Sequence, residues 1–310
     1  MGHTKAAKKC LKVVLIAVMA AIYLTGCGGQ PLSRQEIVRA VFFGREGMQK
    51  QVLFVIEDQQ NSDETAVYKT ARGKGETFAQ AMQKAEASLE GRASYGLMEF
   101  AGFPAEVEFE EAGELAGLLN EKVQPAPEIF VAAVPDLQFE APAEQAGELY
   151  ETMMADDSVR CGLQELSTNP DCAALPQWQE TGWGFLLLPK EGIPLRLNNG
   201  AEAALASVLC GQCFSVDFSF GNGKEALKAG AYKTVFQDTV YLHLTKPELT
   251  SLTGEWNEVQ AREALKQSWR QTFTNLAAVP GDPMRLDFWA TCRNGSGATC
   301  TDPGFEILFE

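Results

Sequence analysis

Cys27 is the residue of this chain whose surroundings most clearly indicate a chemical reaction. Its thiol follows Leu24-Thr25-Gly26 directly, and this pattern is typical of a lipobox, where the sulfur is diacylated and the cysteine becomes the new N-terminus. The preceding residues are typical of an export signal, because four lysines come before the apolar run 13–24. This run is shorter than the roughly 20 residues that span a bilayer, so we expect residues 1–26 to be a cleaved lipoprotein signal peptide.

Acylation of Cys27 would hold the rest of the chain on a membrane. Two acyl chains on the sulfur, joined by a third on the amine, exceed the roughly two signals that stable anchoring needs. No other segment of the sequence is long and apolar enough to span a bilayer. We therefore expect a lipid-anchored protein, palmitate being one such acyl chain, on the outer face of the cytoplasmic membrane.

The chain that remains after residue 26 is strongly acidic. Residues 1–26 hold four of the 26 basic side chains and none of the 41 acidic ones, which leaves 22 basic against 41 acidic groups, a difference of −19. Such a surface repels nucleic acid and anionic headgroups, so we expect no nucleic-acid partner. The hydrophobic share of 45% is ordinary for a folded globular protein, and the length suffices for two modest domains or one large one.

Of the eight cysteines, Cys10 lies in the expected signal peptide, and the six that follow Cys27 fall into three pairs of near neighbours. Export favours disulfides, although six cysteines allow 15 connectivities and neighbour pairing is only one of them. The spacing of Cys210-Gly211-Gln212-Cys213 also suits zinc, but only His243 could add a histidine, and no second pair has this spacing. A redox-active motif would begin a helix, whereas this one follows the predicted helix 201–209. We expect disulfides, no metal and no cofactor; the candidate pairs are Cys161/Cys172, Cys210/Cys213 and Cys292/Cys300.

Catalytic residues are scarce. General acid–base and nucleophilic mechanisms usually need a titratable base beside the nucleophile, and His243 is the only histidine after residue 26. It alternates with Leu242 and Leu244, as in a half-buried strand. The acidic run 106–111 fits a solvated face that leads into a helix better than a hydrolase pair. We therefore predict that the protein is not an enzyme.

Two groups of residues could bind a small ligand. Gly73-Lys74-Gly75 precedes a predicted helix and could form an anion nest, or a plain turn with a helix cap. Trp178, Trp183 and Tyr150 could line a cleft between domains, or lie in the core or in an interface. We expect the second alternative in each case.

Hydrophobic periodicity predicts an α+β fold with two mixed α/β domains, each a β-sheet with packed helices. We expect an N-terminal domain over 27–135, a linker or small cysteine-containing insert over 136–182, and a C-terminal α+β domain over 183–310. Residues 58–75 are polar and glycine-bearing, and Thr77 and Gln80 form a capping-box pattern. Strands are predicted at 36–43, 51–57, 93–100, 128–134, 185–188, 194–197, 213–220, 232–245, 284–291 and 305–309. Helices are predicted at 77–89, 109–122, 143–154, 201–209 and 255–276. In the last helix the apolar stripe comprises Val259, Leu265, Trp269, Phe273 and Leu276.

The order of several short motifs resembles that of the Ger(x)C family, the lipoprotein C subunits of spore germinant receptors. After the lipobox come Arg34-Gln35-Glu36-Ile37 at the first strand, Lys74-Gly75-Glu76-Thr77 before a helix that carries Ala81, and the segment from Gly91-Arg92 to Gly96. Gly184-Phe185-Leu186-Leu187-Leu188-Pro189-Lys190 is similar to the strand–lysine segment that opens the family's C-terminal domain. The long helix with Trp269 and the terminal strands keep the same order.

The chain also departs from the family's pattern. Gly28-Gly29 stands where the family commonly shows Trp-Asp, and Leu97 stands where a histidine often follows the glycine. The region between the halves is shorter and carries cysteines. The pattern thus indicates a divergent, shortened member.

The resemblance implies a non-catalytic subunit that acts in spore germination. It implies a location at the spore inner membrane and two partners, a multi-pass A subunit and a transporter-like B subunit. The alternative is a solute-binding lipoprotein that delivers a small molecule to a membrane transporter.

Overall fold

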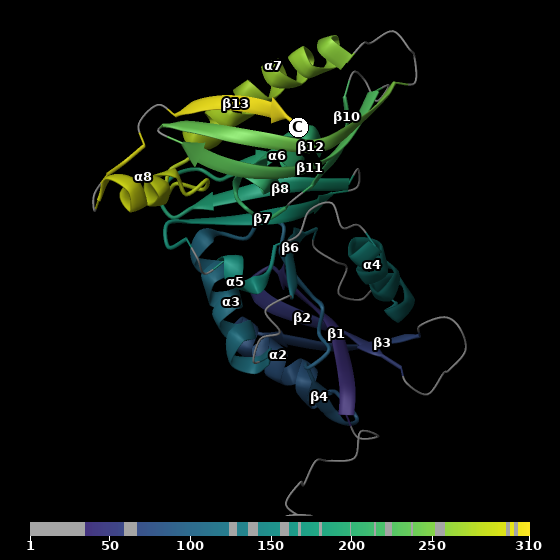
Figure 1. Cartoon of the computed structure of the whole chain (residues 1–310). Helices are drawn as coiled ribbons and strands as arrows, with labels where there is room; N and C mark the ends of the chain where they lie inside the picture. Colours follow the sequence, from purple (N-terminus) through teal and green to yellow (C-terminus); the bar gives the residue numbers. More distant parts are fainter. Residues whose placement is uncertain are drawn as a thin grey trace, which may run out of the picture.

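The computed structural model describes residues 35–58, 67–123, 129–135, 142–155, 161–166, 169–179, 182–198, 200–213, 215–220, 225–236, 238–251, 258–295, 298–300 and 303–310. The predicted signal segment and Cys27 lie outside these residues. Two β-sheets with packed helices form the described chain (Figure 1), so the predicted α+β class is confirmed. None of the described helices is both long and apolar enough to cross a bilayer.

The first sheet holds nine of the described strands. Their order is β3-β2-β1-β5-β6-β7-β8-β9, and β4 pairs with the beginning of β1. Pairing is parallel from β1 through β5 and β6 to β7, and antiparallel towards both edges. The strands are β1 (Gln35–Glu46), β2 (Gln49–Glu57), β3 (Tyr68–Gly75), β4 (Arg92–Ser94), β5 (Phe100–Pro104), β6 (Phe130–Val134), β7 (Cys172–Gln179), β8 (Gly182–Pro189) and β9 (Leu195–Leu197).

Central strands of this sheet are buried on both faces. Phe42 and Phe43 of β1 lie in different cores, because consecutive side chains of a strand point to opposite faces. One core packs under α2, α3 and α5, and the other packs under α4 and α6 and continues to the second sheet. The helices are α2 (Phe78–Ala87), α3 (Phe109–Val123), α4 (Ala143–Ala155), α5 (Leu163–Leu166) and α6 (Gly200–Leu209).

The second sheet has the order β10-β11-β12-β13, and α7 lies across it (Figure 1). Phe273 of α7 stacks on Phe305 of β13, with ring centroids 4.5 Å apart and planes inclined by 9°. Trp269 is fully buried, as the predicted stripe requires, whereas Val259 in the first turn is 75% exposed. The elements are β10 (Ser215–Phe220), β11 (Glu225–Phe236), β12 (Thr239–Ser251), α7 (Glu258–Ala277), α8 (Leu286–Asn294) and β13 (Gly304–Phe309).

Two strands form where none was predicted. β3 lies in the polar segment 58–75. It was not predicted because its buried face is made of small residues with a weak hydrophobic signal, namely Ala71, Gly73 and Gly75. β7 lies within 136–182, the predicted linker or insert, and it carries a proline, which usually argues against a strand. That segment therefore supplies a strand of the first sheet.

Three further predictions of elements were wrong. The strand predicted at 232–245 is the hairpin of β11 and β12, in which Phe236 pairs with Thr239. The hairpin was missed because the residues between these two form none of the dipeptides typical of tight hairpins. The strand predicted at 93–100 is two short strands, β4 and β5. The strand predicted at 284–291 is helix α8, whose first N–H groups, on Leu286 and Asp287, donate to the carboxylate of Asp282 over 2.6 and 2.8 Å.

Candidate functional site

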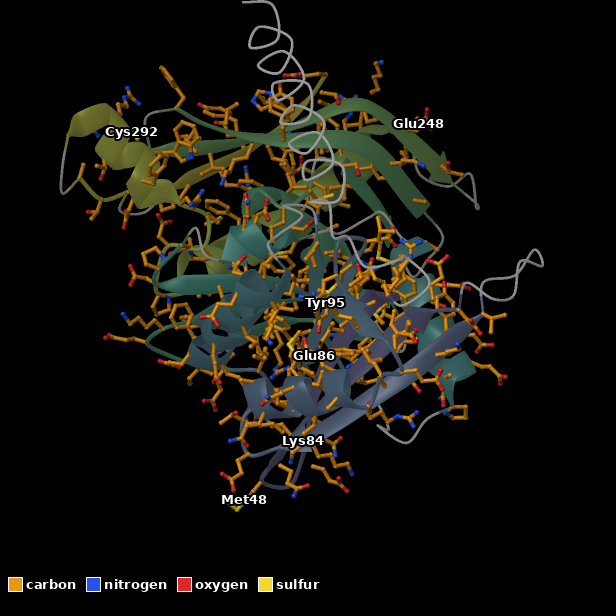
Figure 2. All side chains as sticks on the ribbon, turned by 90° about the horizontal axis from the view of Figure 1, so that it is seen from below. Met48, Lys84, Glu86, Tyr95, Glu248 and Cys292 are labelled. Atoms are coloured by element: carbon orange, nitrogen blue, oxygen red, sulfur yellow. The ribbon has the colours of Figure 1, made fainter. Side chains whose placement is uncertain are left out.

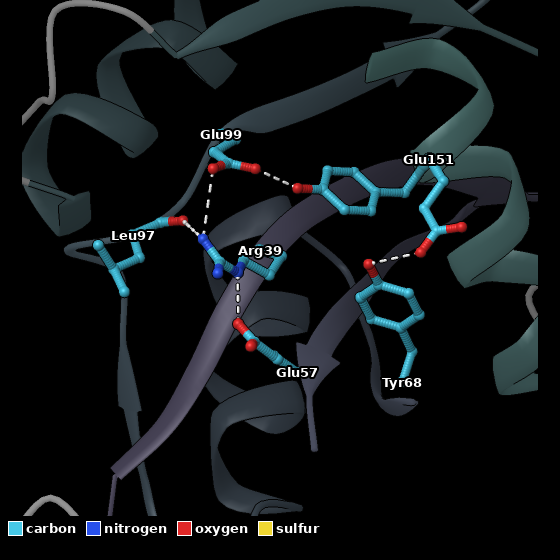
Figure 3. A network of polar contacts seen from close by, with 7 residues as sticks. Arg39, Glu57, Tyr68, Leu97, Glu99 and Glu151 are labelled. Atoms are coloured by element: carbon cyan, nitrogen blue, oxygen red, sulfur yellow. Dashed lines mark hydrogen bonds and ion pairs between the residues drawn. The ribbon is translucent and has the colours of Figure 1, made fainter. Parts of the chain in front are cut away.

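The most connected polar cluster that the structure describes is centred on Arg39 of β1 (Figure 3). Its Nε donates to Glu57 Oε2 over 2.6 Å, and its Nη1 donates to Glu99 Oε1 over 3.3 Å and to the carbonyl of Leu97 over 3.4 Å. The hydroxyl of Tyr150 donates to the other oxygen of Glu99. The cluster thereby joins β1, β2, the segment before β5 and helix α4.

The charge of Arg39 is more than balanced within this cluster, because both Glu57 and Glu99 pair with it. Burial lowers the pKa of Arg39, but the hydrogen bond and charge of Glu57 outweigh burial, and the pKa lies above its ordinary value. The guanidinium therefore stays charged, and two carboxylates already neutralise it. It can position α4 on the sheet, but it offers little charge to an incoming anion.

Two tyrosines pack edge to face beside Arg39, with ring centroids 5.8 Å apart. Tyr68 donates to Glu151 Oε1 over 2.9 Å. Burial, together with Glu151, raises the pKa of Tyr68 to about 12, and burial with Glu99 raises the pKa of Tyr150 above its ordinary range. Both hydroxyls therefore remain protonated donors at neutral pH, which fits a structural role and not that of a base or nucleophile.

The glycines of Gly73-Lys74-Gly75 allow close packing and do not form an anion nest. A Cβ at Gly73 would lie 1.9 Å from the carbonyl oxygen of Ala81 in α2, so only glycine fits. Lys74 Nζ pairs with Glu46 over 2.6 Å. The plain turn that we expected was wrong, because residues 73–75 form the end of β3. The expected helix cap is present, because Gln80 N–H donates to Thr77 Oγ1 over 3.2 Å, and Gln80 Oε1 accepts from Glu76 N–H over 3.1 Å.

Two of the segments that carry the family resemblance pair with each other in the first sheet. Residues 35–37 of β1 pair in parallel with residues 92–94 of β4. The residues from Gly91 to Gly96 then lead to Leu97, whose carbonyl accepts from Arg39. Figure 2 shows Tyr95 close to Glu86 of α2, and its hydroxyl donates to Glu86 over 2.6 Å. Motifs far apart in sequence thus form one packed unit.

His243 lies on the second sheet, in the alternating strand that the sequence predicted. Its Nε2 is 2.8 Å from Thr234 Oγ1, and its Nδ1 is 2.6 Å from Glu310 Oε1. A hydroxyl, an imidazole and a carboxylate in this order are the parts of a nucleophilic triad. However, Tyr232 stacks on the imidazole with centroids 4.5 Å apart and also bonds Glu310 over 3.3 Å. The imidazole thus contacts Thr234 and Tyr232 of β11 and Glu310, the residue after β13. We call this group of contacts the clamp of the second sheet.

The aromatic residues considered for a ligand cleft lie in the core or beside it. Trp183 of β8 is 7% exposed and contacts Trp178 of β7 at 4.8 Å and Phe130 of β6 at 5.3 Å between centroids. Tyr150 is 5% exposed and belongs to the Arg39 cluster. The core alternative is therefore the one that the structure supports.

The acidic run before and within α3 is only partly solvated. Glu111 is 10% exposed at its side chain, where Lys50 Nζ pairs with it over 2.8 Å and Arg45 forms a second ion pair. Glu106 pairs with Arg196 of β9 over 2.7 Å. Glu106, Glu108 and Glu110 are exposed, as the prediction of a solvated face requires. The prediction was wrong for Glu111, because its cationic partners lie on the β1–β2 hairpin, far away in sequence.

All six cysteines after Cys27 lie in the described residues as free thiols. Cys161, Cys172 and Cys213 are buried, whereas Cys292 is exposed on α8 (Figure 2). Among described residues, no group of three or more His, Cys, Asp or Glu is arranged to hold a metal ion. Neighbour pairing of the cysteines stays a prediction.

No protein-family model matches this chain, and no curated protein matches it. Among solved structures, the chain is similar to the crystal structure of the GerBC protein, with a TM-score of 0.43 and 9% sequence identity over 87% of this chain and 95% of that chain.

Proposed function

We propose that this chain is a lipid-anchored, non-catalytic subunit of a spore germinant receptor, which acts by assembling with integral membrane subunits of the A and B type at the spore inner membrane. The observation that carries the proposal is the convergence of the resemblance motifs. Residues 35–37 pair with residues 92–94, and the backbone at Gly73 is pressed against α2. These motifs therefore specify one framework, which is what a family of assembly subunits would share.

The polar clusters support a role without catalysis. The Arg39 charge is matched by Glu57 and Glu99, and His243 is held between Thr234 and Glu310. Groups that are fully engaged with each other stabilise a surface, whereas a catalyst needs a group that is directed at a substrate.

The proposed anchor places one end of the molecule near the membrane. Gln35, the first residue of β1, follows Cys27 by eight residues, which reach at most roughly 28 Å when fully extended. The beginning of β1 and β4 lie together at the end of the molecule remote from the second sheet (Figure 1). In this proposal the second sheet, at the end remote from the anchor, contacts the extracytoplasmic parts of integral partners.

Mass spectrometry of the native N-terminus tests the anchor. We expect the mature chain to begin at a Cys27 that carries acyl chains, and Cys27→Ala to prevent this maturation and change membrane retention. A native peptide that begins at Cys27 without lipid would contradict the proposed anchor.

Affinity isolation from spore membranes tests the partners. The chain, tagged at its C-terminus and expressed from its own locus, is solubilised with mild detergent and analysed by quantitative mass spectrometry beside an untagged strain. We expect enrichment of A-type and B-type integral subunits. Enrichment of an ATP-binding cassette permease in their place would indicate the solute-binding alternative and refute the receptor role.

A further inference from the structure

Two cysteines that neighbour pairing assigns to different bonds lie in the same core. Cys172 begins β7, is 2% exposed and belongs to the core that contains α6. Cys210 follows the last residue of α6 and packs against that same core. Cys161, the near neighbour of Cys172 in sequence, is buried in the core on the other face of the first sheet.

The turn between α7 and α8 contacts the surroundings of both thiols. A Cβ built at Gly281 would lie 3.0 Å from the Cβ of Cys172. Three residues later, the carbonyl of Met284 accepts from Lys233 Nζ over 2.7 Å, and the same ammonium donates to the carbonyl of Leu209, the residue before Cys210. This short turn therefore contacts Cys172 directly and, through Lys233, the residue before Cys210.

A second contact fixes the chain after Cys210 to β7. Gln212 Nε2 donates to the carbonyl of Ala174 over 2.6 Å, and each of these residues lies two positions after one of the two cysteines. The thiol of Cys161 reaches the same carbonyl over 3.5 Å from the other face of the sheet, so Cys161 is the alternative partner that the experiment must exclude. The chain that follows α6 is thus hydrogen-bonded to the beginning of β7 near both thiols, and a disulfide there would reinforce an existing contact.

We infer that Cys172 and Cys210 form a disulfide when the exported chain folds, and that this bond joins the first sheet to α6. The oxidant is the disulfide of an exported thiol–disulfide oxidoreductase. The thiolate of one cysteine attacks that disulfide and forms a mixed disulfide, from which the second thiolate displaces the oxidoreductase. Two S–H bonds are lost and one S–S bond forms, while the oxidant becomes a dithiol and takes up both electrons and both protons.

The surroundings of the thiols explain why the bond would form during folding. Burial raises the pKa of each thiol to about 12, although the Lys233 ammonium opposes this for Cys210. Since the thiolate is the attacking species, exchange is slow once both residues are covered.

Peptide mapping distinguishes this bond from neighbour pairing without any variant. Protein from its native membrane is denatured and alkylated without reductant, then cut with trypsin. Trypsin releases residues 161–190, which contain Cys161 and Cys172, and residues 197–224, which contain Cys210 and Cys213. We expect these two peptides to be linked, and dithiothreitol to separate them. Neighbour pairing would leave them unlinked, each with an internal disulfide, and would overturn the inference.

A second protease assigns the sulfur. Cleavage before Asp171 divides the first peptide into 161–170, with Cys161, and 171–190, with Cys172. We expect the linked fragment to be 171–190. Cys172→Ser should abolish the link to 197–224, and the matched control Cys161→Ser should keep it. Linkage through 161–170, linkage through Cys213, or alkylation of both thiols in the native protein would refute the inference.

Discussion

Replacing Trp269 with alanine would test whether the crossing of α7 over the second sheet stabilises the molecule. The side chain is fully buried and lies in the core shared by α6, α7 and the second sheet. Truncation of a buried tryptophan loses transfer free energy and leaves a cavity, which together cost about 3–5 kcal/mol. This is a large share of the 5–15 kcal/mol that typically stabilises a domain, and it corresponds to a fall in Tm of roughly 6–20 °C.

The matched control is Trp289→Ala, since Trp289 of α8 is 47% exposed and its loss should cost about 1 kcal/mol or less. Thermal unfolding of both purified variants measures the difference. The amount of each chain in spore membranes, with that of copurifying subunits, measures its consequence. Equal falls in Tm for the two variants would refute the assignment of Trp269 to a core that stabilises the fold.

Further predictions concern packing, titration and the clamp on the second sheet. Gly73→Ala should lower the free energy of unfolding by about 1–3 kcal/mol, because its Cβ would overlap the backbone of α2. The control Gly113→Ala, whose Cβ would have no atom within 4 Å, should raise the free energy of unfolding by about 0.5–1 kcal/mol. Similar urea midpoints for the two variants would contradict this prediction. Tyr68 should titrate at about pH 12 because burial raises its pKa, so its stabilising contribution is complete below pH 10 and is lost as the pH rises through about 12. Tyr68→Phe should remove this step from a tyrosinate absorbance titration. His243→Ala should leave germination near wild type at matched expression, and a stable variant without function would overturn the non-catalytic role.

Elements with local signals were predicted well. Helix α2 begins where the Thr77 cap indicated, and α7 buries Trp269 on the predicted stripe. Both features depend on residues within a few positions of each other. β3 was missed, because the glycine and alanine residues on its buried face carry little hydrophobic periodicity. α8 was predicted as a strand, because the helix depends on a cap from Asp282, four residues before its first N–H group.

The polar clusters could not be read from the sequence. Arg39 meets Glu57 and Glu99 across 18 and 60 residues of chain, and His243 meets Glu310 across 67. These contacts depend on which strands are neighbours and in which register they pair. Glu111 of the acidic run at α3 was misjudged for the same reason, because its cationic partners, Arg45 and Lys50, lie on a distant hairpin.

The sequence by itself determined the α+β class, the candidate lipid-anchored cysteine and the scarcity of catalytic groups, because composition, periodicity and a contiguous motif are local properties of the chain. Only the tertiary structure decided that Gly73 serves close packing, that Arg39 and His243 are engaged by partners, and that Cys172 shares a core with Cys210 and not with Cys161. Strand order and register bring those residues together, and they arise from the packing of the whole chain, which no short segment encodes.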